Sequence, residues 1–379
     1  MRLRETPVPI PNTMVKPQAA DGTALETVWE SRWLPELKKR KEVECIVCVT
    51  AQHREMLDQV LETFKIIPDY DLNIMKKTQT LADITTRALI GLEDVIKKEK
   101  PDLVLVHGDT TTTFVGGLAA FYNQVDIGHV EAGLRTYNKY SPYPEEMNRQ
   151  MISCLADMNF APTNLSKQNL LNDNKREGTI YVTGNTVIDA MKTTVIKNYY
   201  HPIFDWIGTD RMILLTAHRR ENLGEPMRHI FTAIKRIVDE FNDVKVIYPI
   251  HMNPKIREIA NEILGNSDKV RIIEPLEVFD FHNFQNKSYL ILTDSGGVQE
   301  EAPSLGKPVL VLRDTTERPE GIEAGTLKLV GTDTDRIYKE TKELLTNKEE
   351  YEKMAKAINP YGDGLASKYI TDAIIAKYN

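Results

Sequence analysis

Two glycines and three carboxylates stand in the stretch "TDSGGVQEE", which continues an apolar run and covers residues 293–301. Ser295, Gly296 and Gly297 would open a helix whose backbone N–H groups face the edge of a sheet. The dipole of such a helix favours an anion, and the glycines let a ligand approach the backbone closely. The stretch therefore predicts a phosphate site, although a helix cap with a tight turn would need the same residues.

A second polar stretch, "TAHRREN", places His218, Arg219 and Arg220 after another apolar run. The two cations oppose a bound metal ion but suit a diphosphate, to which His218 can donate a hydrogen bond. Arg313 and Arg318 add positive charge after a later run. A surface cluster of salt bridges is the alternative interpretation.

Carboxylates gather in the first half of the chain, where "HGDTTTT" and "HVEAGLR" follow apolar runs. Asp109 and Glu131 would be buried there unless paired, and burial raises the pKa of a carboxylate towards values useful for proton transfer. The stretch "SPYPEEMNR" adds two glutamates, of which Glu145 is the first. Pairing of these acids with Arg135 or Arg149 for structural reasons is equally compatible with the sequence.

Two further features bear on these stretches. The four threonines after Asp109 most simply cap the following helix. His107 and His129 have no cysteine or HxxxH pattern beside them, so we expect no metal site.

These polar stretches need elements that bring them together. Continuous apolar runs rich in β-branched residues predict strands at 43–50, 102–108, 125–130, 179–184, 211–217, 244–250, 270–275, 289–295 and 308–313. Helical patterns alternate with them, and one carries apolar residues at helical spacing from Met227 to Phe241. Strands alternating with helices predict an α/β fold with parallel sheets, in which ligands bind beyond the carboxyl ends of the strands.

The length of 379 residues suggests two domains. The pattern loosens after residue 184, and "YYHPIFDWIGTD" is interpreted as a linker. A possible helix near residue 34 is interrupted by Pro35. We expect an N-terminal domain at 1–185 with an atypical segment at 1–42, a C-terminal domain at 186–364, and a final helix at 365–378 that could pack on either.

Composition narrows the class of protein. The net charge of −7 and the pI of about 5.7 argue against nucleic acid as the main partner. The chain has neither a run of about 18 apolar residues nor an apolar signal-peptide core near its start, so we expect a cytoplasmic protein with no membrane contact. Cys45 and Cys48, three apart on an expected strand, would face opposite sides as buried thiols.

Taken together with "TGNTVIDA", "YPIHMNP" and "NPYGDG", the quoted stretches resemble the bacterial non-hydrolysing UDP-N-acetylglucosamine 2-epimerases from about residue 43 to the C-terminus. The resemblance implies two Rossmann-like domains of the GT-B type, an active site in the interdomain cleft, and a homodimer without metal or NAD. It implies interconversion of UDP-N-acetylglucosamine and UDP-N-acetylmannosamine for cell-envelope polysaccharides, through loss and return of UDP and a 2-acetamidoglucal intermediate.

The resemblance also implies roles for individual residues. Asp109, Glu131 and Glu145 would exchange protons, and His218 would steady the diphosphate. Substrate contacts would come from Arg135 and Arg149, which orient carboxylates or sugar, from Phe281 beside the uracil, from Ser295, Gly296 and Gly297 at phosphate, from Glu301 at the ribose, and from Arg318 at the UDP moiety.

The sequence departs from the family in two places. Residues 1–42 contain no match to the Gly-Thr-Arg-Pro-Glu loop with which members begin. At the allosteric site, where Gln52, His53, Arg219 and His251 are kept, Glu55 replaces a usual glutamine and Thr78 a usual arginine. Both changes remove contacts to an anionic second ligand, so we expect weakened activation by substrate.

Three other functions share much of this pattern. A hydrolysing epimerase would release N-acetylmannosamine and UDP. A GT-B glycosyltransferase would need an acceptor site, which fits the carboxylate-rich first half less well. An inactive nucleotide-sugar binder would result if the altered N-terminus removed activity.

Overall fold

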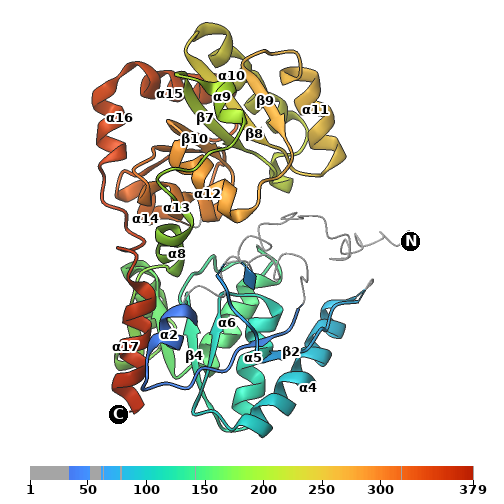
Figure 1. Cartoon of the computed structure of the whole chain (residues 1–379), viewed down its shortest axis with the longest axis vertical. Coiled ribbons are helices and arrows are strands. Elements are labelled where there is room, and N and C mark those ends of the chain that lie inside the picture. Colours follow the sequence, from blue (N-terminus) through green and yellow to red (C-terminus); the bar gives the residue numbers. More distant parts are fainter. Residues whose placement is uncertain are drawn as a thin grey trace. The chain divides into compact units, whose positions relative to one another are not determined.

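The computed structural model describes residues 34–51, 61–62, 64–76, 79–140, 142–316 and 318–378. These residues form two compact units, which divide between Val182 and Thr183 (Figure 1). Both units are built from parallel strands that alternate with helices. The expected α/β fold with two Rossmann-like parts is therefore confirmed.

The first unit contains a parallel sheet in the order β3-β4-β5-β6. Its strands are β3 (Leu103–His107), β4 (Asp126–Val130), β5 (Met158–Ala161) and β6 (Ile180–Val182), and its helices are α2 (Leu34–Lys39), α4 (Leu81–Glu99), α5 (Thr111–Tyr122), α6 (Glu145–Leu155), α7 (Asn164–Asn172) and the 3-10 turn η2 (Glu177–Thr179). Helix α5 packs on α4 and α6, and fully buried Ile127 and Ile152 belong to the core beneath it.

The second unit contains a six-stranded parallel sheet in the order β12-β11-β10-β7-β8-β9. Its strands are β7 (Arg211–Thr216), β8 (Val244–Pro249), β9 (Val270–Ile273), β10 (Leu290–Thr293), β11 (Val309–Val311) and β12 (Leu327–Leu329). Its helices are α8 (Thr186–Thr194), α9 (Ile203–Ile207), η3 (Arg220–Asn222), α10 (Glu225–Glu240), α11 (Pro254–Leu264), α12 (Val278–Lys287), α13 (Gly296–Ser304), α14 (Pro319–Glu323), α15 (Thr334–Thr346), α16 (Lys348–Ala355) and α17 (Ala366–Tyr378). The terminal helix α17 contacts α8.

Local chemistry explains where the principal helices form. The apolar face of α10 buries Met227, Ile230 and Phe231 against the sheet, as its spacing predicts, and each such side chain contributes about 1.5–3 kcal/mol by leaving water. Thr110 caps α5, because its side chain accepts a hydrogen bond from the backbone N–H of Thr113. The threonine run therefore caps a helix, as expected.

The predicted strand at 43–50 is wrong for most of its length. Only β1 (Cys48–Val49) is a strand, and it pairs in parallel with β2 (Tyr70–Asp71) as a separate two-stranded sheet. The Val47 carbonyl oxygen accepts hydrogen bonds from the N–H groups of Asp69 and Tyr70, but the strand begins only at Cys48. Cys45 and Cys48 are half-buried rather than buried, and desolvation, followed by the nearby Asp71 carboxylate, raises the pKa of the Cys48 thiol to about 11.

The linker predicted at 199–210 is also wrong. Tyr199 is buried in the second unit's core, its hydroxyl donates to Asp280 Oδ1 at 2.6 Å, and α9 follows it. Its aromatic residues pack on Phe284 rather than marking a boundary. Pro35 does not interrupt α2 but lies in its first turn, where a helix needs no donated hydrogen bond. The other expectations for 1–33 lie outside the described residues.

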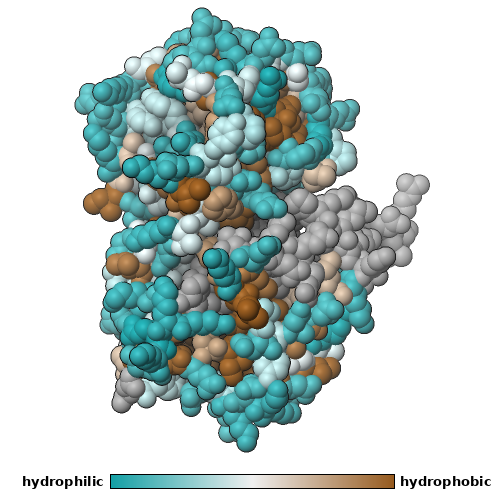
Figure 2. Space-filling view, in the orientation of Figure 1, coloured by the Kyte–Doolittle hydropathy of each residue, from teal (hydrophilic) through white to brown (hydrophobic). Residues whose placement is uncertain are grey.

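Within the described ranges, no helix combines the length and apolar character needed to span a bilayer. Hydrophilic side chains dominate the face of the second unit visible in Figure 2.

Candidate functional site

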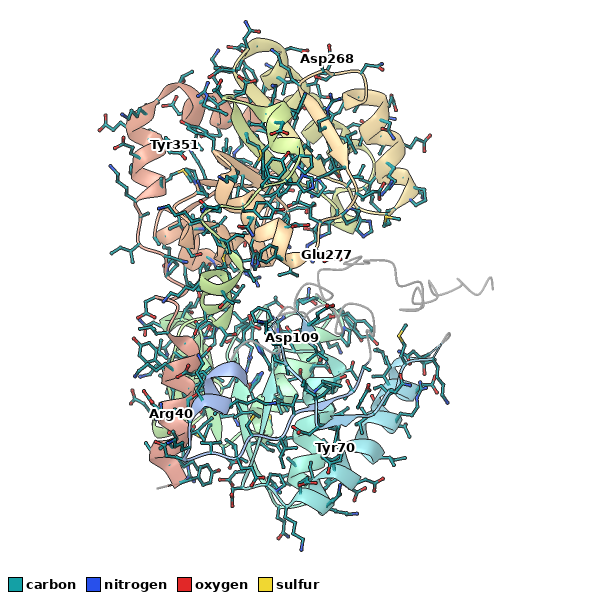
Figure 3. The ribbon with its side chains drawn as sticks, viewed as in Figure 1. Arg40, Tyr70, Asp109, Asp268, Glu277 and Tyr351 are labelled. Atoms are coloured by element: carbon teal, nitrogen blue, oxygen red, sulfur yellow. The ribbon has the colours of Figure 1, made fainter. Side chains whose placement is uncertain are left out.

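Asp109 lies two residues beyond the end of β3, at the carboxyl end of the first sheet (Figure 3). Its buried carboxylate accepts hydrogen bonds at Oδ2 from Arg149 Nη2 at 2.5 Å and from Arg149 Nε at 3.1 Å. Arg149 Nη1 also donates to Oε2 of Glu146 at 3.3 Å. One buried guanidinium thus compensates two buried carboxylates, an arrangement that holds Asp109 in a fixed orientation.

Glu146 anchors the loop that precedes α6. It is fully buried and accepts hydrogen bonds from the backbone N–H groups of Thr136 and Tyr137, both at 3.0 Å, and from Gln150 Nε2 at 2.7 Å. Its neighbour Glu145 is buried in the first turn of α6, where the helix dipole favours a carboxylate. From the sequence, Glu146 is only one of the carboxylates in "SPYPEEMNR", whereas in the structure it supports this loop.

Glu131 follows β4 in the left-handed conformation, with φ of 65°. Its Oε2 lies 3.5 Å from Nε2 of the buried His107. His129, which is fully buried beside it, contacts the carbonyl oxygen of Gly108 through Nε2 at 2.7 Å. Burial lowers the pKa of His129 to about 4, so the ring is neutral near pH 7 and Nε2 carries the proton that it donates.

Arg135 binds elsewhere in the first unit. Its Nε donates to Asp173 Oδ2 at 2.8 Å, and its Nη2 donates to Ser153 Oγ at 2.9 Å. These contacts join the loop after β4 to α6 and to the end of α7. Of the two arginines suggested as partners for the acids, it is Arg149 that the structure brings to Asp109.

In the second unit, the glycine stretch opens α13 as predicted. Ser295 is the N-cap, and Gly296 and Gly297 are the first helical residues. The backbone N–H of Ser295 donates to Thr293 Oγ1 at 2.9 Å, which orients the turn. The first N–H groups of a helix have no intrahelical acceptor, so this end can bind an anion.

The loop after β7 carries His218 and is organised by Asp294, which lies immediately before Ser295. Asp294 is fully buried, and its Oδ2 accepts hydrogen bonds from the backbone N–H groups of His218 and Arg219, both at 2.8 Å. Asn222 Nδ2 donates to the same oxygen at 3.1 Å. The backbone of this half-buried loop is therefore held by a buried carboxylate.

The residues assigned to an allosteric site are only partly described. The rings of His218 and His251 stack with 5.9 Å between their centroids, and Arg219 Nε donates to the carbonyl oxygen of Asp294 at 3.3 Å. His251 and Arg219 are thus both near His218. Gln52, His53, Glu55 and Thr78 lie outside the described residues, as does the side chain of Arg220.

Arg318 and Glu300 form a buried ion pair, with 2.6 Å between Nε and Oε1. Asn185 Nδ2 also donates to the Glu300 carboxylate, and Asn185 N–H donates to the carbonyl oxygen of Tyr361 at 2.7 Å. The motifs "TGNTVIDA" and "NPYGDG" therefore meet beside the arginine that was assigned to UDP. Arg313 pairs with Glu221 instead.

Glu301 is equally buried, and Gln285 Nε2 donates to its Oε2 at 2.6 Å. His282 Nε2 lies 3.7 Å from the same oxygen, and its Nδ1 lies 2.6 Å from Thr194 Oγ1. Phe281, on the same helix, is buried within the second unit's core. Helix α12 thus carries both the partners of Glu301 and the residue assigned to uracil.

Sequence reasoning missed three contributors to these clusters: Asp294, Asn148 and Gln285. Asn148 Nδ2 donates to the Asp109 carbonyl oxygen at 2.9 Å. The sequence could have indicated Asp294, because a charged residue between a buried strand and a glycine pair must either be exposed or have buried hydrogen-bond partners. Among the described residues, no group of three or more histidine, cysteine, aspartate or glutamate side chains could hold a metal ion.

Comparisons with known proteins agree with this arrangement of motifs. The family model described as UDP-N-acetylglucosamine 2-epimerase matches residues 35–375. UDP-N-acetylglucosamine 2-epimerase of Bacillus subtilis (strain 168) is 64% identical over 357 residues, which cover 94% of each chain. The structure of S. aureus MnaA with UDP has a TM-score of 0.86 at 54% identity and covers 94% of each chain.

A Neisseria meningitidis UDP-GlcNAc 2-epimerase bound to UDP-GlcNAc has a TM-score of 0.84 at 48% identity, and the match covers 92% of this chain and 97% of that one. The match of the family model extends over most of the chain and includes every stretch from "HGDTTTT" to "NPYGDG". The chain belongs to the UDP-N-acetylglucosamine 2-epimerase family.

Proposed function

We propose that the protein interconverts UDP-N-acetylglucosamine and UDP-N-acetylmannosamine without releasing free sugar. The family match over residues 35–375 supports the substrate, as do relatives solved with UDP or UDP-GlcNAc. The observation that carries the proposal is the separation of chemistry between two sets of motifs. Buried carboxylates end the strands of the first sheet, and an open helix N-terminus with a histidine loop ends strands of the second.

The reaction needs both sets, because the hydrogen at C2 of the sugar is not acidic. Breaking the C1–O bond sends its electrons to the departing UDP, and the C2 proton passes to a carboxylate as the C1=C2 double bond of 2-acetamidoglucal forms. UDP then adds back to C1 while a proton is delivered to the opposite face of C2. We assign these proton transfers to Asp109, Glu131 and Glu145, each of which typically contributes about 10²–10⁴-fold.

The second unit would hold the nucleotide in this proposal. The N–H groups at Ser295, Gly296 and Gly297 suit a phosphate, and His218 stabilises the charge on the departing diphosphate. Further contacts follow the family pattern, with Glu301 at the ribose, Arg318 at the UDP moiety and Phe281 at the uracil. In the first unit, Arg149 orients Asp109, and Arg135 supports the loop that carries Glu131.

We further propose a cytoplasmic homodimer whose product serves cell-envelope polysaccharide synthesis, as the family resemblance implies. Activation by a second substrate molecule at Arg219, His251, Gln52 and His53 should be weak, because Glu55 and Thr78 replace groups that would favour an anion. Rate against substrate concentration should therefore be close to hyperbolic, and a strongly sigmoidal curve would contradict this part. Light scattering of the purified chain tests the dimer.

The decisive experiment follows the reaction in D₂O by NMR, starting from UDP-N-acetylglucosamine. We expect deuterium at C2 in both UDP-sugars and no free sugar. Accumulation of N-acetylmannosamine with UDP would identify a hydrolysing epimerase. Binding of UDP-N-acetylglucosamine without any exchange at C2 would identify a nucleotide-sugar binder.

Variants test the assignment of the acids. Asp109→Asn and Glu131→Gln should lower kcat on the order of 10²–10⁴-fold. Glu177→Gln is the matched control, because Glu177 is an exposed carboxylate of the same unit that pairs with Lys167. If Asp109→Asn retained the activity of the control, Asp109 would have no part in proton transfer.

A further inference from the structure

A buried carboxylate links the two loops that are assigned to phosphate. Asp294 lies between β10 and α13, and its backbone N–H donates to the Thr216 carbonyl oxygen at 3.1 Å. Thr216 and Thr293 share a hydroxyl hydrogen bond of 2.5 Å. The Asp294 side chain then binds the backbone of His218 and Arg219. One residue therefore sets the position of the histidine loop relative to the α13 N-terminus.

The two oxygens of Asp294 have different surroundings. Oδ2 accepts the three hydrogen bonds described above, from two backbone N–H groups and from Asn222. Within the described part of the chain, no donor forms a hydrogen bond with Oδ1, although the carboxylate is fully buried. The His218 ring lies close to this oxygen, with 3.2 Å between Nδ1 and Oδ1.

We propose that Asp294 is a positioning residue that keeps His218 protonated at Nδ1, so that Nε2 is the nitrogen that acts on a phosphate oxygen of the ligand. A buried carboxylate oxygen requires a donor, and a small rotation of the imidazole aligns Nδ1–H with Oδ1. Deprotonation at Nδ1 would instead place a lone pair against a negative charge. The choice of nitrogen therefore follows from the Asp294 contact.

This assignment rests on the proposed function, in which His218 faces the diphosphate, and it defines what His218 does there. A neighbouring carboxylate favours the charged form of an imidazole, whereas the adjacent Arg219 and the stacked His251 ring oppose further positive charge. When the ring gains a second proton, Asp294 holds Nδ1–H and offsets the charge of the imidazolium, and Nε2–H donates to the departing phosphate oxygen. No covalent bond forms to the histidine, and the proton stays on Nε2 when UDP returns.

The tautomer of His218 tests the proposal directly, without substrate. Long-range ¹H–¹⁵N NMR of the full chain with labelled histidine distinguishes the two ring nitrogens, and the His218→Gln variant assigns the signal. We expect neutral His218 to carry its proton on Nδ1 in the wild type. In Asp294→Asn, the carboxamide N–H₂ can face Nδ1, and the proton should move to Nε2. A wild-type ring protonated at Nε2 would overturn the proposal.

Activity provides the second readout. Asp294→Asn should lower kcat on the order of 10²-fold with a smaller change in KM, because a carboxamide cannot offset the charge of the His218 imidazolium that donates to the departing UDP. Asp243→Asn is the matched control, since Asp243 is a largely exposed aspartate of the same unit that pairs with Arg211. A folded Asp294→Asn protein with the kcat of the control would refute the role.

The outcomes separate this inference from the proposed function. If Asp294→Asn does not fold, the wild-type tautomer still decides the question. If deuterium enters C2 but His218 is protonated at Nε2, the epimerase proposal stands and the role of Asp294 fails. If the tautomer is as expected but no deuterium enters C2, the proposed reaction fails while the Asp294 contact stands.

Discussion

Replacing Arg149 with methionine should destabilise the first unit more than any exposed charge substitution. Methionine keeps most of the apolar volume but removes both hydrogen bonds to the Asp109 carboxylate. Glu146 keeps three other donors, so the cost comes mainly from Asp109. Removing one partner of a buried ion pair typically costs about 3–5 kcal/mol, which is the magnitude that we expect for Arg149→Met.

Native-state hydrogen exchange with mass spectrometry can measure this loss one unit at a time. Peptides from β3, β4 and α5 should exchange on the order of 10²- to 10³-fold faster in Arg149→Met, since about 1.4 kcal/mol corresponds to a factor of ten. Peptides from β7 and β8 belong to the second unit and provide the internal control. Lys167→Met, which removes an exposed partner of Glu177, should leave both sets unchanged.

A double variant isolates the cause. Asp109→Asn combined with Arg149→Met leaves a neutral amide in place of the uncompensated charge, so roughly 2 kcal/mol of the loss should be recovered. If the double variant is no more stable than Arg149→Met alone, the destabilisation comes from packing. The reasoning from charge compensation would then be refuted.

Three further predictions concern other described residues. The folded-state pKa of His129 is about 4 and lies below its unfolded value near 6.5, so the unfolded chain binds more protons between these pH values. Up to roughly 3 kcal/mol of the free energy of unfolding, fully present above pH 6.5, is therefore lost as pH falls through 4. Urea unfolding of the first unit should show this slope in the wild type and not in His129→Gln. The raised pKa of Cys48 should slow its reaction with thiol reagents on the order of 10²-fold. Cys154 is the exposed thiol, so Cys154→Ser should remove the fast-reacting group, and rapid labelling of Cys48 in that variant would contradict this. Gly184→Ala should lower the free energy of unfolding by about 1–3 kcal/mol, because the φ of Gly184 is +83° and the new Cβ would lie 3.1 Å from Gly362 Cα. Gly325→Ala, where φ is +78° and the Cβ would meet open space, should lower it less in the same hydrogen-exchange measurement.

The sequence predicted the buried strands well where their pattern was continuous. Strands β7 and β8 agree with their apolar runs, because both faces of each strand are covered. Strand β5 was missed because the fully buried Asn159 interrupts its apolar residues, and β12 was missed because Lys328 separates the two leucines of a strand with only three residues. The reverse error at 43–50 arose because an apolar run does not reveal whether a neighbouring strand is long enough to pair with it.

The positions of the candidate residues at strand ends were predictable, but the partners of their side chains were not. Asp109 and the α13 glycines could be identified because polar residues after parallel strands gather at the carboxyl end of a sheet. Asp109 and Arg149, however, are 40 residues apart, and Asn185 and Glu300 are 115 apart. Such pairs depend on how helices pack over the sheet, which no local pattern records. For the same reason, Asp294 could be seen in its motif but not connected to His218.

The distribution of these partners indicates how the charges of the candidate site are tolerated in a folded protein. In the first unit, Arg149 compensates Asp109 and Glu146; in the second, Asp294 contacts His218 and Glu300 pairs with Arg318. Each of these pairs is contained within one unit, so the desolvation cost of its charges is offset before any ligand is bound. Fixed partners also keep these side chains oriented. Oriented groups stabilise the charge that develops in a transition state more than the charge already present in the bound substrate. Disruption of one pair should therefore impair catalysis more strongly than nucleotide binding, and kcat measured beside KM in Arg149→Met and Asp294→Asn would reveal that difference.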